Sequence, residues 1–565
     1  MDYKKQLAKL IALDGFSQGE IESYITPAAE VAFGDFSLPC FRFSKALKKA
    51  PNAIASELAA SISAKLPDFL KAVGAVGGYL NFTLDRERAA GVALDEVLTK
   101  GAAYGESGEG KGKTVCIDYS SINIAKPFHI GHLGTTVIGA ALYRIHKKLG
   151  YNTVGINHLG DFGTQFGKLI VAYKLWGDKR GIEADGLRAL VDIYVRFHKE
   201  EETSPALTDE AREWFLKIEK KDPEALELFH FFKDTTMKEV EKTYERLGVT
   251  FDSYAGESFY NDKMQPVIDE LKAKNLLTVS DGASIVDLTE YGMPPCLILR
   301  SDGASLYATR DLATAFYRKN TYNFDKCLYV VAYQQNLHFK QVFKVVELMG
   351  HDFYKDMIHV AYGMVSLEDG AMSTRKGNMV YLSDVLDKAK EKSLAIIREK
   401  SPDIKDAESI AEAVGVGAVI FSALVNNRIK DNVFSYDKIL NFDGETGPYL
   451  QYTYARCNSI VEKAGIESKT APDLSSVAGE EAYAVVKLLT EYPEVLRSAK
   501  EAYEPSFVTR YLIDLAQAYN KFYFENRVLD ENASVRAARV RLTKAVKLVL
   551  KSGFEILGIQ AVEHM

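Results

Sequence analysis

The chain has 565 residues, of which 47% are hydrophobic and 26% are charged, and its formal net charge at pH 7 is −7. This composition excludes a largely disordered chain, and the length predicts about three or four domains. The acidic balance argues against a protein that coats nucleic acid non-specifically, although a local basic face remains compatible with it.

The five cysteines are scattered along the sequence and include no CxxC pair. An odd, dispersed set is typical of core thiols in a reducing compartment and not of disulfides or a zinc site. The N-terminus, MDYKKQLAKLIALDGFS, has no apolar signal-peptide segment, and we expect no membrane-spanning stretch after it. These features predict a cytoplasmic protein.

Residues 1–110 are predicted to form an α+β N-terminal domain that ends in a linker. PNAIASELAASISAKL has helical periodicity, whereas GYLNFTL alternates apolar and polar residues like a strand. The Gly-rich stretch YGESGEGKGKT follows. It ends like a P-loop, but Gly108 precedes the final Gly-Lys by three residues where that motif needs four, and a strand follows it instead of preceding it. A linker is therefore the favoured interpretation.

From residue 114 the pattern predicts a Rossmann-type parallel sheet within a domain of residues 111–440. TVCIDYS resembles a strand, LGTTVIGAALYRIHKKLG a helix, and YNTVGINHLGD a second strand with its turn. Further strand patterns occur in PPCLILRS and KCLYVVAY. A charged run over about 175–290 predicts a helical insertion, and almost everything after about residue 380 is predicted to be helical.

The stretch INIAKPFHIGHLG, residues 122–134, contains two of only ten histidines in the chain. It falls in the turn between the first parallel strand and its helix, where open α/β sheets bind ligands and a helix N-terminus favours phosphate. His129 and His132 have the reach to donate to phosphate oxygens, Lys126 adds charge, and Gly131 leaves room for a nucleotide base. Such donors stabilise the negative charge that develops on an α-phosphate under attack.

Two other interpretations of the histidine pair remain open. HxxH is half of a zinc site, but no second ligand pair of suitable spacing lies nearby in the sequence. The two residues are alternatively ordinary histidines in a turn.

HIGH after a strand is the signature of class I aminoacyl-tRNA synthetases, and the longer phrases resemble the arginyl-tRNA synthetases across essentially the whole chain. The phrases that carry the resemblance are FGDFSLPCFRFSKALKKAPNAIASELA, SSINIAKPFHIGHLGTTVIG, NHLGDFGTQFGKLI, LYATRDLATA, YVVAYQQNLHF and MSTRKGN. The resemblance implies an N-terminal domain that contacts the corner of the tRNA, a class I catalytic domain, and an all-α anticodon-binding domain over 441–565.

The same resemblance implies an arginine–tRNA ligase. Arginine and ATP, the latter carrying Mg²⁺, would give arginyl-adenylate and pyrophosphate, and the arginyl group would pass to the 3′ end of tRNA(Arg). It further implies that tRNA must bind before arginine is activated, and that the protein is a monomer.

Selecting arginine requires a carboxylate that accepts a guanidinium. Tyr307 and Asp311 are four residues apart, hence neighbours on one face if their segment is helical, and Glu257 is a further candidate. Asp118 and Asn123 belong to the end of the first strand. By resemblance, the groups that hold the amino acid's backbone atoms are Asn123, His129 and Gln335, and those that contact the guanidinium are Tyr307, Asp311 and Glu257. A solvated helix face with an incidental tyrosine is the alternative for residues 307 and 311.

Class I enzymes carry a second phosphate-binding segment, usually KMSKS, and the matching run here is AMSTRKGN. Ala371 and Thr374 stand where the family has lysines. The remaining ATP-binding and catalytic candidates of this run are Met372, Ser373, Arg375 and Lys376. By resemblance, Lys126 compensates for the missing lysines. Gly134 and Ile122 also depart from the family, which usually has Arg and Pro there.

The C-terminal helices interleave aromatic and basic residues, as in GPYLQYTYARCNSI, a pattern that suits an anticodon loop. Tyr449 and Tyr452 are candidates for base contacts, and a plain helical bundle is the alternative. Two other functions remain open for the whole chain: a nucleotidyltransferase that does not act on tRNA, and a catalytically silent tRNA-binding paralogue.

Overall fold

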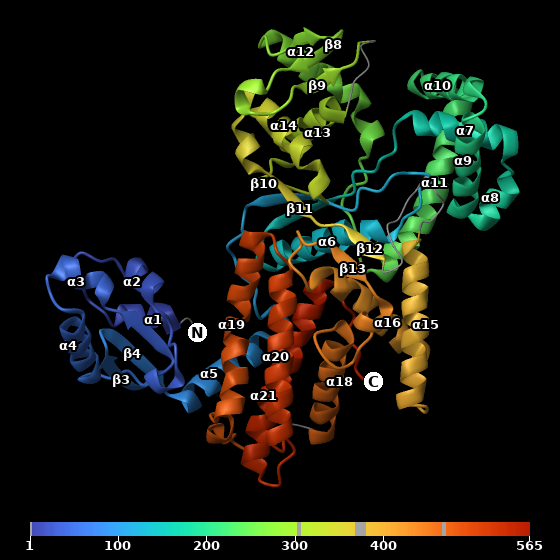
Figure 1. Cartoon of the computed structure of the whole chain (residues 1–565). Coiled ribbons are helices and arrows are strands. Elements are labelled where there is room, and N and C mark those ends of the chain that lie inside the picture. Colours follow the sequence, from blue (N-terminus) through green and yellow to red (C-terminus); the bar gives the residue numbers. More distant parts are fainter. Residues whose placement is uncertain (1–2, 302–306, 368–379, 466–469) are drawn as a thin grey trace. The chain divides into compact units, whose positions relative to one another are not determined.

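The computed structural model describes residues 3–301, 307–367, 380–465 and 470–565 (Figure 1). The chain divides into two compact units, and both receive stretches of the C-terminal helices. One unit comprises Met1–Tyr104, Arg456–Tyr492 and Asp514–Val549, and the other comprises Gly105–Ala455, Pro493–Ile513 and Leu550–Met565. The three domains expected from the sequence therefore stay a prediction.

The N-terminal part of the first unit is an α+β fold on an antiparallel sheet of order β1-β2-β4-β3. Its strands are β1 (Thr26–Pro27), β2 (Phe36–Pro39), β3 (Leu70–Val76) and β4 (Tyr79–Leu84). Its helices are α1 (Tyr3–Lys9), α2 (Gln18–Tyr24), α3 (Phe41–Leu47), α4 (Pro51–Ser63) and α5 (Arg86–Lys100). The helix and strand predicted in PNAIASELAASISAKL and GYLNFTL are confirmed as α4 and β4, and α4 packs against β3 and β4.

The second unit is built on a parallel sheet of order β11-β10-β5-β6, which confirms the predicted Rossmann-type arrangement. Its strands are β5 (Thr114–Asp118), β6 (Asn152–Ile156), β10 (Lys326–Ala332) and β11 (Met357–Tyr362), and the helices that connect them include α6 (Leu133–Lys148), α13 (Tyr307–Tyr322) and α14 (Asn336–Leu348). The Gly-rich stretch before β5 forms turns and enters a strand, as a linker does and a P-loop does not.

The insertion between β6 and β10 is largely helical, as predicted. Its helices are α7 (Thr164–Trp176), α8 (Lys179–Asp185), α9 (Leu187–Glu201), α10 (Pro205–Glu219), α11 (Pro223–Arg246) and α12 (Met264–Ala273), and α7 to α11 gather into a cluster of their own in Figure 1. It also holds a small antiparallel sheet that the sequence analysis missed in part. The strands of this sheet are β7 (Thr278–Ser280), β8 (Ala283–Val286) and β9 (Cys296–Leu299).

After residue 380 the described chain is helical apart from one short strand, which largely confirms the prediction. The helices are α15 (Leu382–Lys400), α16 (Ala407–Leu424), α17 (Tyr436–Ile439), α18 (Gly447–Ala464), α19 (Glu480–Ala502), α20 (Ser506–Glu525) and α21 (Ala533–Leu557). The strand is β13 (Asn432–Phe434), which pairs in parallel with β12 (Val365–Leu367).

Our expectation that no segment has the length and apolar character of a membrane span is wrong for α16. This helix passes that test by length and composition, yet 67% of its apolar window is buried inside the structure. It packs along α15 and α6, where Gly415 leaves no room for a side chain against the backbone of Ala389. A core helix of this kind passes the same test, so the match is weak evidence for a membrane. The five cysteines are free and buried, as predicted for core thiols.

Candidate functional site

The predicted site lies at the carboxyl edge of the parallel sheet, in the turn that joins β5 to α6. Asp118 ends β5 and is in register with Tyr329 of β10, so the turn starts at the centre of the sheet. Asn123 makes an isolated parallel bridge with Gly160, beyond the end of β6. Open α/β sheets bind their ligands at such an edge.

Three residues of this turn other than glycine have left-handed backbone angles. The φ values are 69° at Ser120, 47° at Ser121 and 58° at Ala125. Each such conformation costs about 1–3 kcal/mol and persists only when its surroundings fix it. Here the amide of each residue donates to a side chain of another segment. The acceptors are Thr135 Oγ1 at 3.0 Å, Asn157 Oδ1 at 3.1 Å and Thr236 Oγ1 at 3.2 Å.

The 3₁₀ turn η3 (Ile130–His132) lies directly before α6, and His129 is its N-cap residue. We call residues 126–132, which contain both histidines, the histidine turn. The Gly131 amide donates to Nδ1 of His129 at 3.0 Å, and the His129 amide donates to Nδ1 of His132 at 3.3 Å. The ring centroids are 4.0 Å apart. Because each Nδ1 accepts a hydrogen bond, the neutral rings carry their protons on Nε2 and use that N–H as a donor.

Both imidazoles are neutral near physiological pH. Burial lowers the pKa of His129 to about 4, and the neighbouring Lys126 lowers it further. Burial, together with His129 and Lys126, lowers the pKa of His132 to about 3. Burial also lowers the pKa of Lys126, and the nearby Glu257 carboxylate counters that effect. The turn therefore offers two neutral donors beside one cation, which suits a phosphate group.

The histidine turn is held by the chain on both sides of residues 368–379. The Ile130 amide donates to Val380 O at 3.2 Å, and the Leu382 amide donates to Phe128 O at 2.8 Å. On the other side, β12 packs against η3. The predicted residues Met372, Ser373, Arg375 and Lys376, with Ala371 and Thr374, lie outside the described residues.

The candidates for guanidinium recognition lie on η4 (Glu257–Lys263) and α13. Tyr307 and Asp311 share the first turns of α13, which confirms that their segment is helical. Tyr307 is exposed. Burial raises the pKa of Glu257 to about 7. The positive charges of Arg310 and Lys126 lower this pKa in part, and the negative charge of Asp311 raises it further. The electrostatic coupling of Glu257 with Lys126 and Asp311 indicates that these candidates lie near the histidine turn.

The carboxylates of Glu257 and Asp311 each already lie close to a nitrogen atom of another side chain. Arg310 Nη1 lies 3.5 Å from Glu257 Oε2, which is a long contact. His338 Nε2 lies 2.5 Å from Asp311 Oδ2. Each partner would have to share or yield its position for a substrate guanidinium to bind both carboxylates.

The other substrate candidates differ in their surroundings. Asp118 is buried and binds Arg318 Nη2 at 2.7 Å, and the Arg318 side chain is fully buried. Arg318 holds the pKa of Asp118 below its usual range although burial acts in the opposite direction. Asn123 lies so close to Gly160 that a Cβ there would stand 2.4 Å from its Oδ1. Gln335, in η6 (Tyr333–Gln335) just after β10, is exposed.

The structure adds supporting residues that the sequence analysis did not single out. Asp161 is fully buried and accepts hydrogen bonds from Lys233 Nζ at 2.7 Å and from both the amide and the hydroxyl of Ser258, each at 2.8 Å. It thereby fixes the segment that begins with Glu257. Asp161 and Arg310 lie within the phrases NHLGDFG and LYATRDLATA, which carry the family resemblance. Their position in these phrases was the sequence feature that could have identified them as site residues.

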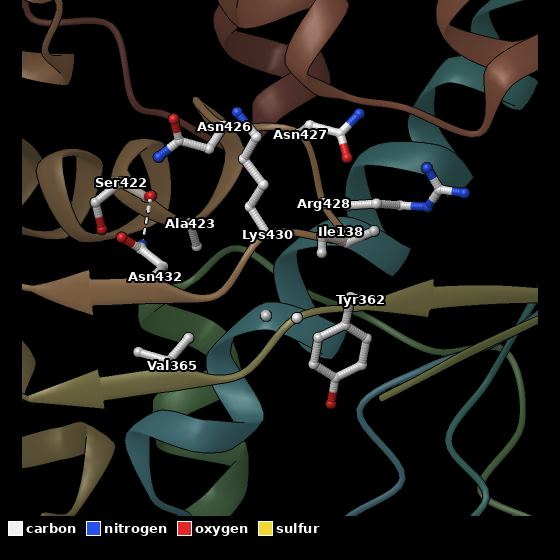
Figure 2. A pocket seen from close by; sticks show the side chains of 12 residues that line it. Ile138, Tyr362, Val365, Ser422, Ala423, Asn426, Asn427, Arg428, Lys430 and Asn432 are labelled. Carbon is white, nitrogen blue, oxygen red and sulfur yellow. Dashed lines mark hydrogen bonds between the residues drawn. The ribbon is translucent and has the colours of Figure 1, made fainter. Parts of the chain in front are cut away.

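Gly134, one of the two departures from the family pattern, has a packing explanation. A Cβ at this position would stand 3.3 Å from the ring of Tyr362, so the tyrosine occupies the space of a side chain. Both residues line a small pocket, and Figure 2 shows Tyr362 and Val365 on one side of it and Asn427 and Arg428 on another. Ile122 is buried, and nothing further in the structure explains it.

The C-terminal candidates both lie on α18. Tyr452 is exposed and Tyr449 is half-buried. Their role in base contacts stays a prediction. Phe524 of α20, which the sequence analysis did not select, is 90% exposed, the largest exposed fraction of any large hydrophobic side chain in the described chain.

Comparisons with known proteins cover almost the entire chain. Residues 93–436 match the family described as tRNA synthetases class I (R), catalytic domain, residues 450–565 match the DALR anticodon binding domain, and residues 2–84 match the arginyl tRNA synthetase N terminal domain. Arginine–tRNA ligase of Halothermothrix orenii is 50% identical over 567 residues, which is 100% of both chains. The enzyme of Clostridioides difficile is 50% identical over 566 residues with the same coverage. The solved arginyl-tRNA synthetase of Thermus thermophilus has a TM-score of 0.80 at 27% identity and covers 96% of each chain.

Because burial lowers the pKa of both imidazoles, we predict that neither ring becomes protonated between pH 5.5 and 8. The measurement is NMR of the protein with ¹³C-labelled histidine, with single His→Gln variants to assign the resonances. His230, which is exposed on α11, serves as the reference resonance. A midpoint above about 6 for His129 or His132 would contradict the prediction.

Proposed function

The chain belongs to the arginyl-tRNA synthetases of class I and is an arginine–tRNA ligase, and from that premise we propose how its residues divide the reaction. Its substrates are arginine, ATP and tRNA(Arg). The observation that carries the proposal is the histidine turn, where two neutral Nε2 donors and Lys126 gather at the carboxyl edge of the sheet.

In the proposed first step, the arginine carboxylate attacks the α-phosphorus of ATP and pyrophosphate leaves. His129, His132 and Lys126 bind phosphate oxygens and stabilise the negative charge that develops on them. Gly131 gives the nucleotide close access to the backbone of the turn. Ser373 and Met372, together with the cations Arg375 and Lys376, are proposed as the second group of phosphate contacts. In the next step, the terminal ribose hydroxyl of the tRNA attacks the arginyl carbonyl and AMP leaves.

Glu257 and Asp311 are proposed to bind the arginine guanidinium, with the ring of Tyr307 beside its plane. Asn123 and Gln335 are proposed to hold the amino acid's backbone groups. For Asp118 the surroundings support an indirect role. Its Oδ1 accepts from Ser121 Oγ at 2.6 Å and its Oδ2 from Arg318, so it fixes the strained turn that presents Asn123.

Magnesium is proposed to arrive on the phosphates of ATP. In the part of the chain that the structure describes, no group of three His, Cys, Asp or Glu side chains is arranged to hold a metal ion. The donors beside the predicted phosphate site are cationic or neutral, and such a set fits the phosphates better than the ion itself.

We further propose the three-domain division 1–110, 111–440 and 441–565, with the C-terminal helices binding the anticodon, a monomeric state and a cytoplasmic location. The family matches at residues 2–84, 93–436 and 450–565 support the division. Tyr449 and Tyr452 remain candidates for base contacts within the last domain.

The reaction and its order are tested by arginine-dependent exchange of pyrophosphate into ATP. We expect exchange in the presence of tRNA(Arg) and none without it, because activation is proposed to need bound tRNA. Exchange without tRNA would refute the ordering alone. No exchange under either condition would refute the assignment of the catalytic step to this chain.

Lys126→Ala tests whether the cation of the histidine turn acts on the phosphates. We expect the exchange kcat to fall by about 10²–10³-fold, the range for losing one donor to developing charge, while tRNA affinity stays within about twofold. His132→Ala is expected to show a similar loss of exchange kcat and a similarly unchanged tRNA affinity. Lys111→Ala, in the exposed linker, is the control and should leave kcat unchanged. A parallel loss of tRNA affinity would contradict the role of Lys126.

Glu257 makes arginine binding depend on pH. Its pKa is about 7, and a bound guanidinium favours the ionised form, so below pH 7 binding must first expel a proton. The KM for arginine should therefore rise as the pH falls, approaching about tenfold per unit well below 7. The charged groups that face Glu257 are Arg310, Asp311, Asp161 and Lys126. Glu257→Gln should raise KM and flatten its pH profile, whereas a flat wild-type profile between pH 5.5 and 8 would refute the role.

A further inference from the structure

A buried carboxylate, Glu504, lies in the turn between α19 and α20, far along the chain from the predicted site. It is 2% exposed and binds Arg428 from two directions. Its Oε2 accepts from Arg428 Nη1 at 3.1 Å, and its two oxygens accept from the Arg428 backbone amide at 3.3 and 3.2 Å. The Ser506 amide adds a contact at 3.4 Å. The carboxylate thus fixes both the side chain and the backbone of Arg428.

The segment that begins with Arg428 forms hydrogen bonds with the junction between β11 and β12. The Gly363 amide donates to Arg428 O at 2.7 Å, and the Met364 amide donates to Asp431 Oδ1 at 2.7 Å. The Asn432 amide donates back to Met364 O at 2.8 Å, and the pairing of β13 with β12 begins at this residue. The contact is close, because a Cβ on Gly363 would stand 2.4 Å from Lys430 O.

Strand β12, which the segment after Arg428 holds in place, contacts the histidine turn. β12 packs against η3, and Tyr362 packs against Gly134 in the first turn of α6. Figure 2 shows Arg428 and Asn432 on the segment that faces β11 and β12, the strands that bear Tyr362 and Val365. A continuous set of contacts therefore runs from Glu504 through Arg428 and β12 to the turn that carries His132.

We propose that Glu504 and Arg428 are positioning residues for the ATP site, and this rests on the proposed role of His129 and His132. A buried ion pair is weak evidence for stability, because removing both charges from water offsets most of their attraction. This pair is also incompletely satisfied, since Arg428 Nε is buried without a hydrogen-bond partner. Its geometric effect is specific: it sets where β12 lies, and β12 supports the turn. Displacing a reacting group by about 1 Å costs as much as 10²-fold in rate.

The test uses the full chain with Glu504→Gln, which keeps one acceptor oxygen, and Glu504→Ala, which keeps none. The exchange kcat is expected to fall at least threefold in Glu504→Gln and by about ten- to hundredfold in Glu504→Ala, with the KM for arginine within twofold. Glu201→Gln is the control, because Glu201 forms a partly buried pair with Lys168 at 2.8 Å in the helical insertion. It should lower the melting temperature and leave kcat unchanged.

The outcomes separate positioning from stability. A kcat reduction of less than threefold in folded Glu504→Gln overturns the proposal, and so does an equal reduction in Glu201→Gln. If Glu504→Ala does not fold, Glu504→Gln decides alone. The wild type is measured first: a wild type without exchange refutes the proposed function, whereas a slowed variant of an active wild type bears only on the positioning residues.

Discussion

The two hydrogen bonds that backbone amides donate to Nδ1 of His129 and His132 determine what the site can do. They fix the tautomer, so that each ring directs an Nε2–H donor away from its own backbone. Burial then keeps both rings uncharged, because it lowers their pKa values well below neutrality. Two neutral donors in fixed orientations suit the phosphate contacts proposed for these rings. The surrounding contacts, from β12 on one side and from Val380 to Leu382 on the other, hold this small turn in place.

The two carboxylate–arginine pairs near the histidine turn differ in their distance and in the pKa of the carboxylate. Asp118 and Arg318 meet at 2.7 Å in full burial, and the pKa of Asp118 is held low, as in a permanent pair. Glu257 and Arg310 are 3.5 Å apart, and the pKa of Glu257 stays raised, so this carboxylate is incompletely neutralised. A long contact is easily replaced by a shorter one. The tight pair therefore suits the proposed structural role of Asp118, while the loose pair suits the proposed binding of a substrate guanidinium by Glu257.

The sequence predicted the parts of the fold that local pattern encodes. Periodicity identified β5, α6 and β6, and the histidines lie, as the sequence predicted, in the turn between β5 and α6 at the carboxyl edge of the sheet. It missed the hairpin of β7 and β8, although Asp281 and Gly282, with φ of 49° and 80°, are a typical turn pair. Contacts such as Asp118 with Arg318 could not be predicted, since they join residues 200 positions apart. The spacing of residues in the sequence predicts which of them share a helix or strand. It does not predict which side chains from distant parts of the sequence contact them.

Lys126 lies on a backbone that its neighbours fix, which supports its proposed role at the phosphates. In the run AMSTRKGN, Ala371 and Thr374 stand where the family pattern has lysines. Lys126, in contrast, follows directly on Ala125, whose left-handed backbone is fixed by Thr236. A cation on a backbone already fixed by its neighbours needs little reorganisation as charge develops on the substrate, and preorganised charge is the most effective kind in catalysis. The strained backbone before Lys126 thus supports the proposal that this cation and the two histidines bind the same phosphates.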